Sequence, residues 1–116
     1  MAFAYDRLTE IEYIAGAAAA HITNAATKTT YVRLIVLHNT HSSGLEVTMY
    51  NVPDSSESAG TAAAANQFYK DTIVSEDTIT MEFPAPGLIL EDTNDTIQAV
   101  CGTADKVTIQ AYGGVE

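Results

Sequence analysis

The sequence predicts an all-β protein, an antiparallel β-sandwich or jelly roll of about seven or eight short strands. Two observations lead to this prediction. Several segments alternate apolar and polar residues with a period of two, which is typical of a strand with one buried face. Turn-forming residues separate these segments at short intervals. With 116 residues, 47% of them hydrophobic, the chain is long enough to form one domain around its own core.

The first fourteen residues carry bulky apolar side chains without a clean helix or strand period. They form either a strand at the edge of one sheet or an arm that reaches onto a neighbouring subunit. We therefore expect an N-terminal arm or edge strand over residues 1–14 and a single β-sandwich domain over residues 15–116. The candidate subunit contacts in the first segment are Phe3, Tyr5, Leu8, Ile11 and Tyr13.

Two alanine-rich stretches, residues 15–20 and 62–66, combine high helix propensity with small side chains. Each has only four consecutive alanines, which is too few to nucleate a helix unaided. Small side chains also suit a tightly packed strand. We expect a strand in the first stretch, and a loop or a single helical turn in the second.

Residues 31–37 are predicted to form a strand that is apolar on both faces. One face would hold Val32, Leu34 and Val36, and the other Tyr31, Ile35 and Leu37, interrupted by Arg33. A strand in a small two-sheet protein needs one apolar face, so we expect another subunit to cover the second. The candidate subunit contacts on this strand are Tyr31, Arg33, Ile35 and Leu37.

The clearest period-two alternation lies in residues 45–50, 77–83, 96–101 and 106–111, with weaker strand candidates at 18–23 and 68–74. The side chains predicted to point inward are Leu45, Val47, Met49, Ile79, Met81, Phe83, Val107, Ile109 and Ala111. Cys101 is the single cysteine and is in phase with Ile97 and Ala99, so we expect a buried core residue. A lone cysteine excludes an internal disulfide and a zinc site built on thiolates.

The formal net charge is −10, from fifteen acidic and five basic side chains, with most of the acids in residues 51–116. Such a surface repels nucleic-acid phosphates and anionic lipid headgroups, so neither nucleic acid nor a membrane is expected as a partner. No run approaches the roughly 20 apolar residues that span a bilayer. The start of the chain lacks a basic segment followed by an apolar one, so no secretion leader is expected.

The sequence contains no recognisable catalytic constellation. His38 and His41 lie three residues apart at a predicted strand end, where their side chains are expected to diverge. Residues 92–95 (DTND) look superficially like a calcium loop but lack the glycine and distal glutamate of an EF-hand. They are better interpreted as a tight turn, with a surface calcium shared with Glu91 as the alternative. No Gly-x-Ser-x-Gly elbow is present, and we expect neither an enzyme nor a cofactor.

Residues 29–40 (TTYVRLIVLHNT) and 46–54 (EVTMYNVPD) resemble small structural proteins encoded by tailed bacteriophages. Residues 60–68 (GTAAAANQF) and 82–90 (EFPAPGLIL), with 92–95, look like the same kind of chain, so the resemblance covers residues 28–112. It implies a β-sandwich of the virion, on the head as a decoration (cement) protein or in the tail or neck. The motifs are strand and turn patterns, so no functional residues are carried over.

The leading hypothesis is therefore a non-enzymatic capsid decoration protein that self-associates and stabilises the shell from outside. Its expected partners are further copies of itself and the major capsid protein or another virion protein. It would be made in the host cytoplasm and located in the virion. A phage tail or neck component is the first alternative. A carbohydrate-binding module is the second, with Tyr31, Tyr50, Tyr69 and Tyr112 as the available aromatic platforms.

Overall fold

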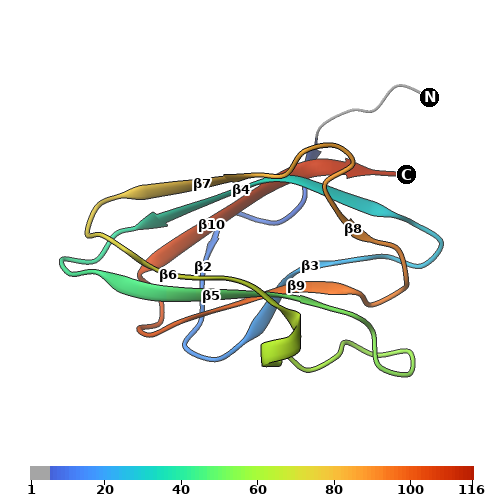
Figure 1. Ribbon diagram of the computed structural model, residues 1–116, viewed down its shortest axis with the longest axis horizontal. Coiled ribbons are helices and arrows are strands. Elements are labelled where there is room, and N and C mark those ends of the chain that lie inside the picture. Colours follow the sequence, from blue (N-terminus) through green and yellow to red (C-terminus); the bar gives the residue numbers. More distant parts are fainter. Residues whose placement is uncertain (1–5) are drawn as a thin grey trace.

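The computed structural model describes residues 6–116 and is an antiparallel β-sandwich of two sheets, as the sequence predicts (Figure 1). The six-stranded sheet has the order β1-β10-β4-β7, with β2 also paired to β10 and β8 to β4. The four-stranded sheet has the order β3-β9-β5-β6. In chain order the elements are β1 (Asp6–Arg7), β2 (Glu12–Tyr13), β3 (Ala19–Thr23), β4 (Thr30–Asn39), β5 (Leu45–Val52), the 3-10 turn η1 (Ala64–Asn66), β6 (Gln67–Ile73), β7 (Thr78–Glu82), β8 (Leu88–Leu90), β9 (Thr96–Cys101) and β10 (Val107–Val115).

The core lies between the two sheets and is built from the inward positions of the alternating strands. Most of the predicted inward side chains are fully buried, namely Val47, Met49, Val107, Ile109 and Ala111, while Leu45, Ile79, Met81 and Phe83 are partly buried against the same core. Cys101 is 1% exposed, and Ile97 and Ala99 beside it are completely buried. The period-two alternation therefore predicts these strands correctly, because each has one face in the core.

Strand β4 differs from the prediction because it contains one extra residue. The residues after it face the opposite side of the sheet from the one expected for a regular strand. Leu34 pairs with Tyr112 of β10 and Val32 pairs with Gly113, so Arg33 is an extra residue that forms a β-bulge. Val32 faces the core before the bulge, and Ile35 and Leu37 face it after the bulge; all three are 0% exposed. The prediction that Ile35 and Leu37 contact another subunit is therefore wrong, since both lie in the core of their own chain.

The N-terminal segment, as far as it is described, lies along the edge of the six-stranded sheet. β1 and β2 both pair with β10, and Ile14 after them is fully buried in the core. Leu8 packs partly against the core, and its backbone N–H donates to the carbonyl of Ala111. Residues 6–14 thus behave as an interrupted edge strand. Phe3 and Tyr5 lie outside the described residues.

Three features are too short or too irregular for the sequence pattern to show. β1 and β2 have two residues each, and β8 has three. β8 continues the line of β7 along β4 after a bend that contains Gly87, where an added Cβ would lie 2.3 Å from the carbonyl oxygen of Val32. The second alanine-rich stretch forms the single turn η1, whereas in the first only Ala19 and Ala20 belong to a strand.

The segment between β5 and β6 covers part of the outer side of the four-stranded sheet (Figure 1). The amide Nε2 of Gln98 donates to the carbonyl of Gly60 at 3.0 Å. Gln98 consequently has an exposure of only 6%, although it alternates with the core residues Ile97 and Ala99. No helix in residues 6–116 is long and apolar enough to cross a membrane.

Candidate functional site: the outer face of the six-stranded sheet

The six-stranded sheet has a side that points away from the core, and we call it the outer face. Residues paired across neighbouring strands share a face, which groups Tyr13 with Thr108 and His38, Gln110 with Val36 and Thr80, and Tyr31 with Ile89. The row that crosses all four strand positions runs from Arg7 through Tyr112 and Leu34 to Glu82. The outer face therefore comprises Arg7, Tyr13, Tyr31, Leu34, Val36, His38, Thr78, Thr80, Glu82, Ile89, Thr108, Gln110 and Tyr112.

The centre of the outer face is apolar, and most of the side chains around it are uncharged. Leu34 and Val36 are half-buried on β4. Val36 has Gln110 and Thr80 on either side, whereas Leu34 has Tyr112 on one side and the carboxylate of Glu82 on the other. Among the outer-face residues the formal charges are Arg7 on β1 and Glu82 on β7, and the carboxylate of Glu116 borders the face at Tyr31. Depletion of charge at the centre and enrichment in tyrosine are typical of protein contact surfaces. In a chain of net charge −10, this composition distinguishes the outer face from the rest of the surface.

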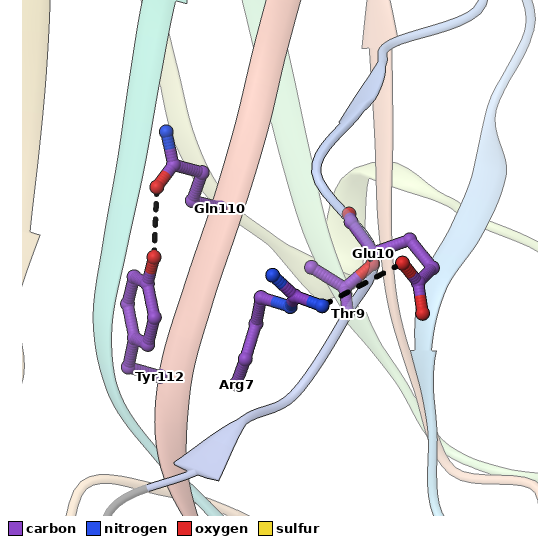
Figure 2. A network of polar contacts seen from close by, with 5 residues as sticks. All are labelled: Arg7, Thr9, Glu10, Gln110 and Tyr112. Atoms are coloured by element: carbon purple, nitrogen blue, oxygen red, sulfur yellow. Dashed lines mark hydrogen bonds and ion pairs between the residues drawn. The ribbon is translucent and has the colours of Figure 1, made fainter.

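Figure 2 shows how side chains are held along β10 and β1. The hydroxyl of Tyr112 donates to Oε1 of Gln110 at 2.8 Å, so both outer-face side chains are fixed in one arrangement. Arg7 lies beside them and forms an ion pair with Glu10 at 3.7 Å. Because both charged groups are largely exposed, at 49% and 83%, this pair contributes little and leaves Arg7 able to turn toward another carboxylate.

Tyr31 and His38 each make a polar contact from the outer face. The hydroxyl of Tyr31 donates to Oε2 of Glu116 at 3.1 Å, and this hydrogen bond to a carboxylate raises the pKa of Tyr31 above its ordinary value of 10.0. Nδ1 of His38 lies 2.8 Å from the hydroxyl oxygen of Thr78. These contacts join β4 to the C-terminus and to β7.

A hollow of about 440 Å³ lies where β7 bends toward β8, next to the bulge of β4. It is lined by Arg33, Leu34, Glu82, Phe83 and Pro84. Nε of Arg33 donates to the carbonyl of Phe83 at 3.1 Å, so the guanidinium helps to fix the wall of the hollow. The outer face is therefore uneven at this corner, and a protruding side chain of a partner could enter it.

Strand β4 is anchored near both ends by the buried side chains of Asn24 and Asn39. Nδ2 of Asn39 donates to the carbonyls of Ser43 and Ile73, at 3.0 and 2.9 Å. Near the other end, Nδ2 of Asn24 donates to the carbonyl of Lys28 at 2.7 Å, and its Oδ1 accepts the hydroxyl of Thr30 at 2.7 Å. Buried polar groups satisfied in this way hold loops in one conformation.

The structure brings only part of the predicted contact set to this face. Tyr13 and Tyr31 lie on it, Arg33 lines the hollow, and Ile11, which is 53% exposed, lies in the connection between β1 and β2. The predicted contact set omits Leu34, Val36 and Tyr112, although Tyr112 is among the aromatic platforms that the sequence offers for a sugar. In a regular strand Leu34 and Val36 share a face with Val32, so the period of two predicts that they point into the core. The apolar character of Leu34 and Val36 was the available signal, but the bulge at Arg33 decides that they lie on the outer face.

An acidic corner lies where the turn 92–95 meets the segment after β5. Carboxylate oxygens of Asp54, Asp92 and Asp95 lie within 4.8 Å of one another. Asp95 is 8% exposed and accepts three backbone N–H donors, from Asp54 at 2.8 Å, Glu91 at 3.2 Å and Asp92 at 3.0 Å. The carboxylate of Asp95 thus acts as the hub of a tight turn.

The remaining titratable candidates lie apart from one another. The carboxylate of Glu12 on β2 contacts Nδ1 of His21 on β3, which ties the two sheets together at one edge. His38 lies at the end of β4, whereas His41 lies in the following loop, where its backbone N–H donates to Oδ1 of Asn39. Cys101 is buried in β9. These residues have structural contacts of their own and do not form one site.

Comparison with known proteins gives a likeness in structure. No protein-family model and no curated protein sequence matches this chain. The chain is similar to the coat protein of tobacco streak virus in a structure of its dimer, with a TM-score of 0.56 and 12% identity over 98% of this chain and 84% of that one. A second structure of that coat protein gives a TM-score of 0.51 and 14% identity over 97% and 84%. At these identities the likeness establishes the fold.

Proposed function

We propose that this chain is a non-enzymatic structural protein of a virion, and specifically a head decoration protein of a tailed bacteriophage that stabilises the shell by contact. The observation that carries this proposal is an open sheet face with an apolar centre, on a fold shared with a viral coat protein. Such a face provides contact area rather than chemistry.

The charge of the chain supports a position outside the shell. At a net charge of −10 the protein is repelled by packaged nucleic acid and stays soluble at the outer surface. The sequence resemblance to small phage structural proteins adds the tailed-phage origin. The coat protein with a similar fold has been determined as a dimer, and this supports self-association as part of the function.

Immunogold labelling of purified particles that carry the gene tests the proposal. If the chain is a decoration protein, the gold should be spread over the whole surface of the heads. Gold confined to the tail or neck would assign the chain to those parts instead. Absence of gold from intact particles, while the same antibody binds disrupted ones weakly or not at all, would refute a virion role.

A further inference from the structure

We infer that the outer face of the six-stranded sheet binds the same face of a second copy of this chain, around a two-fold axis parallel to β4. The inference rests on the proposed contact function and specifies its first partner. Three features of the face support such a dimer: its distribution of charge, the register of its strands, and the area that it can bury.

The charge distribution selects this face for contact between identical chains. Two copies each carry a net charge of −10, so a face rich in carboxylates would oppose its own association. The outer face has Leu34 and Val36 at its centre, with Tyr112, Gln110 and Thr80 beside them and Glu82 as the one carboxylate among its residues. The four-stranded sheet is different, because the segment between β5 and β6 covers part of it and Glu46 and Lys70 are exposed there.

The register of the sheet makes the face complementary to itself. A two-fold axis parallel to β4 exchanges the β10 side with the β7 side, so each copy presents Glu82 above Tyr112 of the other. Arg7 is the neighbour of Tyr112 on β1, one strand spacing or about 4.8 Å further along the same row. Each Arg7 therefore meets Glu82 of the second copy, and the two ends of the row form equivalent ion pairs.

The next row agrees with the same axis. Val36 would meet Val36 of the copy at the centre, while Gln110 would face Thr80, an amide opposite a hydroxyl. A two-fold axis in the interface but perpendicular to the strands would instead place β10 of one copy over β10 of the other. Arg7 and Glu82 would then lie at opposite sides of the interface and could not pair. Sheets packed face to face align within about 30°, so rows near the axis stay matched.

The area is of the size that a specific dimer needs. β4 has ten residues, and four strand positions lie side by side. At about 3.3 Å per residue and about 4.8 Å per strand, the face projects roughly 600 Å². A standard interface buries about 800 Å² of accessible surface on each partner, and a corrugated side-chain surface exceeds its projection.

Sedimentation equilibrium of the full chain and its variants tests the inference. The wild-type chain should form a dimer, and Val36→Glu, which opposes two carboxylates at the axis, should raise the dimer Kd by at least about 30-fold. The matched control is Val74→Glu, since Val74 is 64% exposed in the turn between β6 and β7 and lies off the face. Circular dichroism and Tm of each variant establish that it is folded.

A charge-reversal cycle tests the axis without perturbing the core. Arg7→Glu and Glu82→Arg should each weaken the dimer, and the double variant should restore most of the lost affinity, because it rebuilds the same pairs with exchanged signs. Both side chains are exposed, so these variants keep the test valid even where Val36→Glu folds poorly.

A wild-type chain that stays monomeric at millimolar concentration would overturn the inference. A dimer unaffected by Val36→Glu would overturn the choice of face, and a charge reversal without rescue would overturn the axis. Specific binding of a glycan that is lost in Tyr112→Ala would assign the face to a sugar instead. If gold labels the heads while the chain is monomeric in solution, the inferred dimer fails and the proposed function stands.

Discussion

The bulge at Arg33 decides which of two adjacent apolar residues of β4, Ile35 or Val36, faces the core, and truncating each to alanine tests this directly. Ile35 is 0% exposed in the core, whereas Val36 is half-buried on the outer face. Ile35→Ala removes three buried carbons, worth about 2.4 kcal/mol by transfer. The cavity left behind brings the loss in the free energy of unfolding to about 3–4 kcal/mol. Val36→Ala should cost about 1 kcal/mol or less in the monomer.

Urea denaturation at a fixed, low protein concentration provides the measurement, with a lowered midpoint at constant slope as the sign of lost stability. For 116 residues, the loss from Ile35→Ala corresponds to a fall in Tm of about 12–16 °C. Equal losses from Ile35→Ala and Val36→Ala, or a larger loss from Val36→Ala, would refute the assignment of these residues to the two faces.

Three further predictions concern residues away from the centre of the outer face. Asp95→Ala should lower the free energy of unfolding by about 2–4 kcal/mol, because three backbone N–H donors lose a charged acceptor. Asp95→Asn should cost less, because it keeps one oxygen acceptor. Equal losses of the two variants in urea denaturation would contradict the role of Asp95 as the hub of the turn. Tyr31 has a raised pKa because it donates to Glu116, so the stability from this hydrogen bond is present below pH 10 and is lost as the pH rises through the folded-state pKa. In an absorbance titration Tyr31→Phe should remove a late-ionising tyrosine, and an unchanged late phase would argue against the contact. Gly113→Ala should strongly destabilise the fold because its Cβ would lie 1.8 Å from the carbonyl oxygen of Tyr31, and a thermal scan that shows a wild-type Tm would contradict this close approach.

The fold could be predicted from the sequence where each strand has one face in the core. β5, β9 and β10 alternate cleanly, so their inward residues follow from the period of two. β1, β2 and β8 have three residues or fewer and carry no measurable period. They exist because β10 and β4 offer them free edges, which is a property of the assembled sheet.

The candidate site was predicted only in part, for a physical reason. The sequence shows that residues 31–37 have more apolar side chains than one face requires. It cannot show the bulge, because an apolar run reads the same with or without a shift of phase. The expectation of an uncovered apolar surface on this strand therefore led to Ile35 and Leu37, whereas the structure places Leu34 and Val36 outside. The acidic corner was likewise seen only as the turn 92–95, since Asp54 joins it through the fold.

The central claim is that this chain functions in a virion through the outer face of its six-stranded sheet. The most direct measurement is a cryo-electron microscopy reconstruction of particles that carry the gene, with the structure fitted into the density on the head. The account predicts a sandwich outside the shell, with Leu34 and Val36 buried against a neighbouring subunit. A sandwich bound to the particle with this face open to solvent, or a particle without density for the chain, would contradict it.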